Sequence, residues 1–291
     1  MRIHHFDCGP ARPLGGALMD GVSPGAFGRL TCHCLAIETA AHGVVQVDTG
    51  LGMRDMAHPW SRLPVLNTAS LNFRFGSDRT MLRRLRHAGL SPRDVRHIIM
   101  THLDFDHAGG LIDFPEAWVH VMEPEARAAT ARHGLLDRTR YRPAQWGDTR
   151  RWHRYPERTA GRWFGFDAVV ELEGLPPDFL MVPLPGHSAG HAGVAIEGPR
   201  GWMLHAGDSY FNRAEVHAAQ PGCPAGAAAY ERIMAWDARL GRANQARVRA
   251  LVQEEPTPLA VFCTHDPVEY VAMAVWQGNA DDDRGTDRQV A

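Results

Sequence analysis

The sequence predicts an α/β fold in which helices enclose two β-sheets. Two observations predict it. Short apolar runs typical of strands fall into two groups, one between residues 3 and 122 and one after residue 178, and segments with helical spacing lie between and after these groups. Because each sheet must bury a face against another layer, this order favours two sheets covered by helices.

The first group of strands begins near the N-terminus, at Ile3–Phe6, Leu30–Thr39 and Val44–Asp48. The second of these alternates in TCHCLAIET, and a Gly-containing turn at 42–43 joins it to the third as a hairpin. Residues 51–77 are rich in Pro, Trp and Asn without clear periodicity. We therefore expect a long surface loop there.

Hydrophobic periodicity and capping residues predict further helices and strands. We expect a helix at Thr80–Ala88 closed by Gly89 and a second from Glu123 to about His133. Residues 135–165 carry Arg, Trp, Tyr and Pro in irregular order, which predicts a cap over a cleft. The remaining expected elements are strands at Val95–Met100, Trp118–Met122, Phe179–Leu184, Val194–Glu197, Trp202–His205 and Leu259–Cys263, and two helices within Gly226–Val252.

Composition narrows the classes of function. With 44% hydrophobic and 22% charged residues and a net charge of −2, the chain is typical of a globular enzyme and lacks the basic surface that nucleic acid or anionic membrane requires. Five cysteines without disulfide-type spacing indicate reduced thiols. We find no signal peptide and no run of ~18 apolar residues. We expect one cytoplasmic domain over residues 1–278, with a disordered tail at 279–291.

The densest chemical signal is the segment THLDFDH, which follows an apolar strand directly. It places His102, Asp104, Asp106 and His107 within six residues. In an extended turn, positions 102, 104 and 106 share one side and are able to converge on a metal ion. Imidazole and carboxylate groups are donors that Zn, Mn and Fe accept. A polar loop with structural histidines is the alternative.

Three later segments repeat one pattern, in which an apolar strand, small residues and then a donor follow one another. MVPLPGHSAGH offers His187, with His191 nearby, GWMLHAGDSY offers Asp208, and LAVFCTHDP offers His265. Sandwich folds present such strand ends along one edge, where loops build a site. The repetition favours a metal site over a structural loop.

Together these segments resemble the signature of the metallo-β-lactamase superfamily, with a VDTG element at Val47–Gly50 also matching. The chain looks most like lactonase-type members, including N-acyl-homoserine lactone hydrolases. The resemblance implies an αβ/βα four-layer sandwich with a binuclear site between the sheets. It assigns the donors to two divalent ions, zinc first and Mn or Fe as alternatives, as follows: His102, Asp104 and His187 hold one ion, Asp106, His107 and His265 hold the second, and Asp208 bridges both.

In this resemblance the nucleophile is a metal-bridging hydroxide and Asp106 also handles protons as a catalytic residue. Position 104 departs from the pattern, because the family has His where this chain has Asp104. Three carboxylates, two divalent ions and a bridging hydroxide together make the metal core about neutral, which favours neutral carbonyl substrates over phosphate anions.

Five further residues are lesser candidates. Tyr210 lies two residues after Asp208, one residue short of the tyrosine that assists the carbonyl in lactonase-type relatives, and it is either catalytic or lines the pocket. His191 either orients a ligand or makes an ordinary turn hydrogen bond. Cys32 and Cys34 flank a strand residue and favour a structural interpretation, since neighbouring strand residues point to opposite faces. Asp48 is expected to support the site from beneath.

We therefore expect a metal-dependent hydrolase that opens a lactone or carboxylic ester of a small molecule. The alternatives are a thioester hydrolase of the glyoxalase II type and an iron-dependent oxygen-handling enzyme on the same fold. The expected partner is a small-molecule substrate, without nucleic acid or membrane, and a homodimer is compatible with the sequence.

Overall fold

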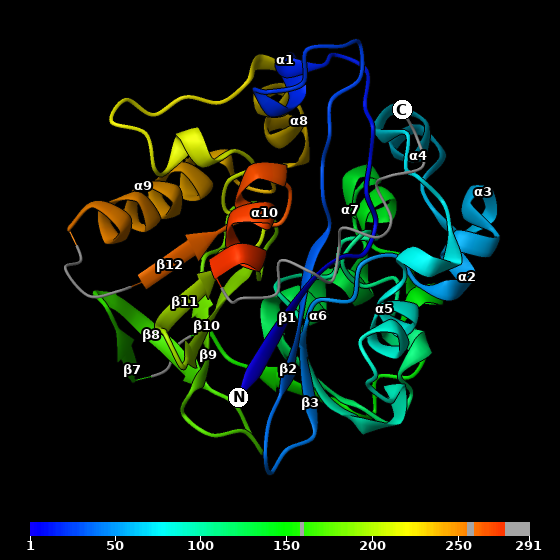
Figure 1. The fold of residues 1–291 in the computed structure, drawn as a ribbon, viewed down its shortest axis with the longest axis vertical. Helices are drawn as coiled ribbons and strands as arrows, with labels where there is room; N and C mark the ends of the chain where they lie inside the picture. Colours follow the sequence, from blue (N-terminus) through cyan, green and yellow to red (C-terminus); the bar gives the residue numbers. More distant parts are fainter. Residues whose placement is uncertain (158–159, 255–258, 277–291) are drawn as a thin grey trace.

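The structure is a computed structural model that describes residues 1–157, 160–254 and 259–276. The tail expected at 279–291 lies outside the described residues. Within them the chain forms two sheets that stand face to face, with helices on both outer sides (Figure 1). The αβ/βα sandwich expected from the sequence is confirmed.

The first sheet takes its strands from the first half of the chain in consecutive order. Its first three strands are antiparallel neighbours, and the later ones run parallel to the third. In the described residues the order is β1 (Arg2–Asp7), β2 (His33–Glu38), β3 (Val44–Val47), β4 (Val95–Ile99), β5 (Trp118–Met122) and β6 (Trp152–Tyr155).

The second sheet takes its strands from the second half, again consecutively. All its described neighbours are antiparallel except β11 and β12, which are parallel. Its described strands are β7 (Gly161–Trp163), β8 (Phe166–Glu171), β9 (Phe179–Pro183), β10 (Ala192–Gly198), β11 (Gly201–His205) and β12 (Leu259–Phe262). Each sheet therefore comes from one contiguous half of the chain.

Alternation along the strands explains how one sheet serves two cores. In β2, Leu35 and Ile37 face the core between the sheets, whereas Cys34 and Ala36 face the helices outside the first sheet. In β10, Val194 and Ile196 face that same inter-sheet core. Successive strand side chains point to opposite faces, so a run that is apolar throughout fits a strand buried on both sides.

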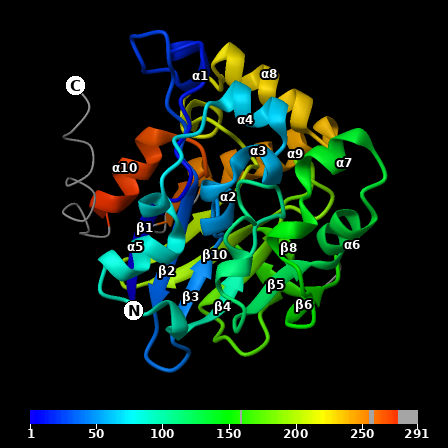
Figure 2. The same ribbon diagram turned by 90° about the vertical axis from the view of Figure 1, so that its right-hand side faces the viewer.

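Helices cover the two outer faces (Figures 1 and 2). The first sheet is covered by α5 (Met81–His87) and α6 (Glu123–Ala131). The second is covered by α9 (Ala238–Glu254), whose Val248 and Leu251 pack in the outer core. Three further helices are α1 (Ala17–Asp20), α8 (Ala225–Met234), which contacts α1, and α10 (Pro267–Trp276), which contacts β1 and β12.

The prediction of a long surface loop at residues 51–77 is wrong. This segment contains α2 (Met53–Ala57), α3 (Pro59–Arg62) and α4 (Val65–Leu71). Each helix spans only one or two turns and buries few side chains, so no helical period develops along the sequence.

The segment at residues 135–165 also differs from an irregular cap. It begins with α7 (Leu135–Arg140) and then supplies β6 and β7, the edge strands of the two sheets. The side chains of β6 are mostly half-buried, so they lack the alternation that marks a central strand.

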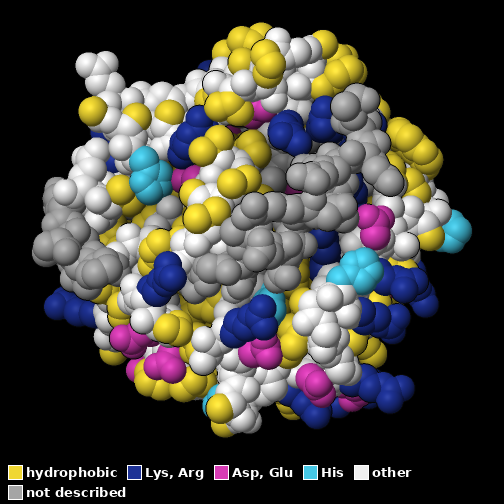
Figure 3. Space-filling model, in the orientation of Figure 1, with side chains coloured by type: hydrophobic (Ala, Val, Ile, Leu, Met, Phe, Trp, Pro, Cys, Tyr) yellow, Lys and Arg dark blue, Asp and Glu magenta, His cyan; other side chains and the backbone are white. Residues whose placement is uncertain are grey.

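On the surface, hydrophobic side chains gather over α1 and α8 at the top of the molecule (Figure 3). Leu18 is 62% exposed and Ile233 is 69% exposed there. Among the described residues, no helix combines the length and the apolar character needed to cross a bilayer.

Candidate metal centre

The predicted donors meet at one edge of the sandwich because each follows the carboxyl end of a strand. β4 leads into the loop that carries His102 to His107, and β3 leads into Asp48 beside it. From the other sheet, β9 leads to His187, β11 to Asp208 and β12 to His265. Loops from both halves of the chain thus build one site, as strand ends do in open α/β sheets.

One group of donors consists of His102, Asp104 and His187, all buried. Oδ2 of Asp104 lies 3.1 Å from Nε2 of His187 and 3.7 Å from Nε2 of His102. Oδ2 of Asp208 lies 3.6 Å from Nε2 of His187 and 3.8 Å from Nε2 of His102. These four side chains aim their donor atoms at a common point.

A second group surrounds the other side of Asp208. Oδ1 of Asp208 lies 3.4 Å from Nε2 of His107, and Oδ2 of Asp208 lies 3.0 Å from Nε2 of His265. Oδ2 of Asp106 lies 4.0 Å from Nε2 of His265. Asp208 therefore lies 3.0–3.8 Å from donors of both groups.

Hydrogen bonds fix which ring nitrogen of His102, His107 and His265 faces the site. Nδ1 of His107 donates to Oδ2 of Asp48 at 2.8 Å, and Nδ1 of His265 donates to the Thr31 carbonyl at 2.7 Å. Nδ1 of His102 lies 3.0 Å from the Thr101 hydroxyl. Since Nδ1 is engaged in all three rings, Nε2 is left for a metal ion, which is the usual arrangement of metal-binding histidines.

His191 holds Asp208 from behind. Its Nε2 accepts a hydrogen bond from the Asp208 backbone N–H at 2.8 Å, and its Nδ1 donates to the Leu184 carbonyl at 3.0 Å. Gly207 permits this approach, because a Cβ there would lie 2.5 Å from Nε2 of His191 and the residue has φ +57°. Of the two interpretations of His191, the structure favours the residue that orients a ligand.

Glu125, at the start of α6, joins the two loops that carry the first group. Its Oε1 accepts from the Leu103 backbone N–H at 2.9 Å. Its Oε2 accepts from the Ser188 hydroxyl at 2.6 Å and from the Gly190 backbone N–H at 3.0 Å. The sequence analysis missed this residue, because a glutamate in a first helical turn is ordinary and its partners lie far along the chain.

The buried carboxylates and imidazoles of the site stabilise each other's charged forms. Burial alone would raise the pKa of Asp208, but His265 and His107 lower it well below its ordinary value. Burial alone would lower the pKa of His107, but Asp208 and Asp48 raise it well above its ordinary value. Carboxylates that stay ionised while buried need positive charge nearby.

The unpaired atoms give a direct test of whether metal ions fit. Within the described residues, Nε2 of His102, Nε2 of His107 and Oδ1 of Asp208 are buried without a hydrogen-bond partner. Buried polar atoms are nearly always paired, so these exceptions at one point call for an explanation. Divalent ions provide it, since imidazole and carboxylate are their ordinary ligands.

Asp104 has a partner that the sequence analysis did not foresee. Nη1 of Arg140, the last residue of α7, lies 3.1 Å from Oδ1 of Asp104, and both side chains are buried. Burial and then the charge of Arg140 lower the pKa of His187, which favours the neutral ring that a ligand must have. The expected charge of the core omitted this arginine, so the argument for neutral substrates from donor charge alone does not hold.

Tyr210 points away from the donors. It is fully buried, and its hydroxyl donates to Oε1 of Glu269 at 3.0 Å. The next residue, Phe211, packs its ring against His187 and His265. Tyr230 of α8 packs against Phe211, and Tyr230 is the tyrosine near the site that sequence spacing did not single out. A catalytic role for Tyr210 stays a prediction.

The sulfur of Cys32 lies closer to the site than a purely structural residue requires. Its donor atom falls within 4.8 Å of those of Asp106 and His265. The thiol donates to the Gly9 carbonyl at 3.2 Å, and burial raises its pKa well above the ordinary value. Alternation along a strand indicates which side chains share a face, but it does not show that the face of Cys32 meets the site.

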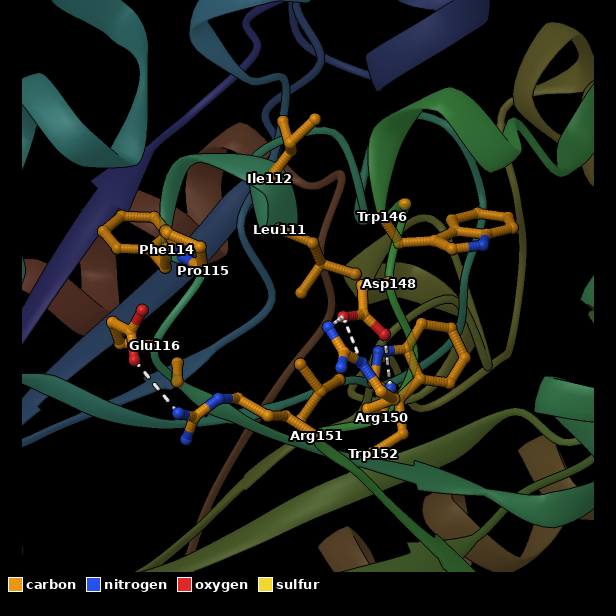
Figure 4. A pocket seen from close by; sticks show the side chains of 13 residues that line it. Leu111, Ile112, Phe114, Pro115, Glu116, Trp146, Asp148, Arg150, Arg151 and Trp152 are labelled. Carbon is orange, nitrogen blue, oxygen red and sulfur yellow. Dashed lines mark hydrogen bonds and ion pairs between the residues drawn. The ribbon is translucent and has the colours of Figure 1, made fainter.

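Two pockets differ in their relation to the donors. One of about 540 Å³ is lined by His187 and Asp208 and runs past Glu215, Cys223 and Glu231. Another, of about 610 Å³, is lined by residues such as Leu111, Trp146 and Arg151 and contains none of the predicted donors (Figure 4). The first is therefore the candidate substrate pocket.

Comparisons with known proteins agree with this geometry. Residues 27–265 match the metallo-beta-lactamase superfamily. A probable metallo-hydrolase of Mycobacterium tuberculosis is 35% identical over 271 residues, covering 93% of this chain and 82% of that protein. An N-acyl homoserine lactonase of Bacillus cereus is 24% identical over 268 residues, covering 87% of this chain and 91% of that protein.

Among solved structures, an N-acyl homoserine lactone hydrolase with the product N-hexanoyl-L-homoserine bound at its catalytic metal centre superposes with a TM-score of 0.69. Its sequence is 20% identical, and the match covers 93% of this chain and 95% of that chain. By its sequence match, its fold and its cluster of donors, the chain belongs to the metallo-beta-lactamase superfamily and is a metal-dependent hydrolase.

Proposed function

We propose that the protein is a binuclear hydrolase that opens a lactone or carboxylic ester of a small molecule. The observation that carries the proposal is the convergence of buried, unpaired donor atoms on Asp208, at the end of the pocket of about 540 Å³. A donor cluster at the end of a pocket of this size is the usual arrangement of a small-molecule enzyme site.

The two donor groups indicate which residues would hold the ions. His102, Asp104 and His187 would hold one ion. Asp106, His107 and His265 would hold the second, and Asp208, whose oxygens lie near His187, His107 and His265, would contact both. Two divalent ions, zinc first among the candidates, would lower the pKa of water from 15.7 to roughly 7 and polarise the carbonyl under attack.

The chain's own residues orient these groups and handle protons. Asp48 fixes the ring of His107 through Nδ1, and His191 fixes the backbone of Asp208. Asp106 lines one small cavity together with Tyr230, Phe211 and His265. A carboxylate there is placed to accept a proton during attack and return it to the leaving alcohol.

The walls of the substrate pocket support a neutral substrate. Glu215 and Glu231 both line it, and burial together with Glu215 raises the pKa of Glu231 to about 8. Arg232 and Arg242 line the same pocket, so its wall carries charges of both signs. Such a wall offers hydrogen-bond donors and acceptors to a neutral ester or amide.

The relatives support the same reaction class. The Bacillus cereus protein is a lactonase by name, and the superposed hydrolase binds a homoserine product at its metal centre. At these levels of sequence identity, the similarity supports a lactone or ester as the first substrate to test. It does not specify the acyl group of that substrate.

Metal analysis of protein purified without chelator, followed by a substrate panel, tests the proposal. We expect about two ions per chain and turnover of lactones or carboxylic esters above that of thioesters and phosphodiesters, with loss of activity on chelation. Thioester turnover above that of every lactone would favour the glyoxalase II alternative. Iron with oxygen consumption and no hydrolysis would favour the oxygen-handling one.

A further inference from the structure

Arg140 is a buried charge with two partners on different segments. Its side chain is 1% exposed, and Nη1 lies 3.1 Å from Oδ1 of Asp104. Nη2 donates to the carbonyl of Met234, the last residue of α8. A guanidinium stays protonated at any ordinary pH, so its positive charge belongs permanently to the site.

Asp104 uses its two oxygens for different neighbours. Oδ1 faces Arg140, whereas Oδ2 faces Nε2 of His187 at 3.1 Å and Nε2 of His102 at 3.7 Å. One oxygen is thus held by the arginine and the other is directed at the point where the donors of the first group converge.

The charges of the two residues cancel. Asp104, Asp106 and Asp208 with Arg140 carry a formal charge of −2, which is also the charge of two carboxylates with a neutral imidazole at position 104. The departure from histidine at this position therefore leaves the charge of the donor set unchanged once the arginine is counted.

We propose that Asp104 and Arg140 act as one unit in place of a neutral histidine ligand: the carboxylate supplies the donor oxygen through Oδ2, and the guanidinium holds Oδ1 and cancels the added negative charge. Arg140 is thus a positioning residue that sets the affinity of the centre for metal ions. The inference rests on the proposed metal site. The rival view is that Arg140 only ties α7 to α8 through Met234.

The two views predict opposite changes when Arg140 is neutralised. In the Arg140→Met variant the donor set becomes one charge more negative, so we expect at least ~10-fold tighter binding of Zn²⁺. Arg140→Lys keeps the charge and should stay within about threefold of the unmodified protein. If Arg140 were only a structural tie, both variants would bind Zn²⁺ equally or more weakly than the unmodified protein.

Asp104→His tests the unit from its other side. A neutral imidazole at position 104 removes one negative charge and leaves the positive charge of the guanidinium uncompensated, so Zn²⁺ binding should weaken at least ~10-fold. In the double variant with Arg140→Met, binding should return to within about fivefold of the unmodified protein, because contacting residues couple. Equal loss from Asp104→His in both backgrounds would overturn the inference.

The measurement is competition for Zn²⁺ with a chromophoric chelator, with thermal denaturation of each metal-free protein alongside. Arg138→Met, an exposed arginine on the same helix, is the matched control and should change neither quantity. Should Asp104→His fail to fold, the opposite effects of Arg140→Met and Arg140→Lys still decide. If the unmodified protein binds no Zn²⁺, the proposed metal site itself is wrong. If it binds Zn²⁺ and Arg140→Met does not bind it more tightly, only this inference is wrong.

Discussion

Glu125 should control both the stability of the protein and its affinity for metal ions, because it joins the loops of Leu103 and Gly190 on either side of the first donor group. Glu125→Gln preserves the shape of the side chain. The amide oxygen is able to serve the Ser188 and Gly190 donors, but the amide NH₂ then faces the Leu103 N–H.

In this variant the hydrogen bond to the Leu103 N–H is replaced by two N–H groups that face each other. The hydrogen bonds from Ser188 and Gly190 weaken because the acceptor is no longer charged. An unsatisfied buried donor costs about 1–3 kcal/mol, so the loss in unfolding free energy should be about 2–4 kcal/mol. For a chain of this size that corresponds to a Tm lowered by about 3–7 °C. Metal affinity should fall about 10- to 100-fold, as it does when residues that support ligands are changed.

Differential scanning calorimetry of metal-free and metal-loaded protein measures the first effect, and chelator competition measures the second. Glu123→Gln is the control, because Glu123 lies in the same helix with its side chain 37% exposed. Equal Tm and equal metal affinity in the two variants would refute the role assigned to Glu125.

Three further predictions follow from single residues. Asp208→Ala should lower both metal content and hydrolysis by several orders of magnitude while the fold persists by circular dichroism; full turnover would show that Asp208 is no ligand. Asp48→Asn removes the acceptor that fixes His107, so metal affinity should fall about 10- to 100-fold with little change in secondary structure. Asp113 has its pKa raised to about 6, by burial and then by Asp55, so the folded state holds this proton more tightly and stability is lost as pH rises through 6. Asp113→Asn should therefore stabilise the protein at pH 8 by up to about 3 kcal/mol and not at pH 4, and an unchanged pH profile of the Tm would contradict this.

The sequence predicted nine of the twelve described strands, all but β6, β7 and β8, and it identified the clustered donors better than the residues that support them. Runs such as Trp118–Met122 are apolar and bounded, and the structure has a strand with those same bounds. The donors are recognisable because four of them lie within one short segment and the others follow strands. Local patterns of this kind need no knowledge of distant contacts.

The residues that support the donors have no such local pattern. Glu125 and Arg140 act only through partners that folding brings from other segments, so neither has a spacing to reveal it. The short helices between residues 53 and 71 are stabilised by packing rather than by period, which explains why they were expected to be a loop. The charge of the core was misjudged for the same reason, since only the folded chain places a guanidinium beside Asp104.

The assignment of each sheet to one half of the chain has a consequence for engineering. A cut in the connection between Tyr155 and Gly161 would give two polypeptides, each with the strands of a whole sheet. The first would carry the donors from His102 to His107, and the second would carry His187, Asp208 and His265. Neither fragment alone has a complete set, so binding of metal ions would be linked to their association. The split protein would then act as a two-piece reporter of free zinc, in which complementation rises with the concentration of the ion.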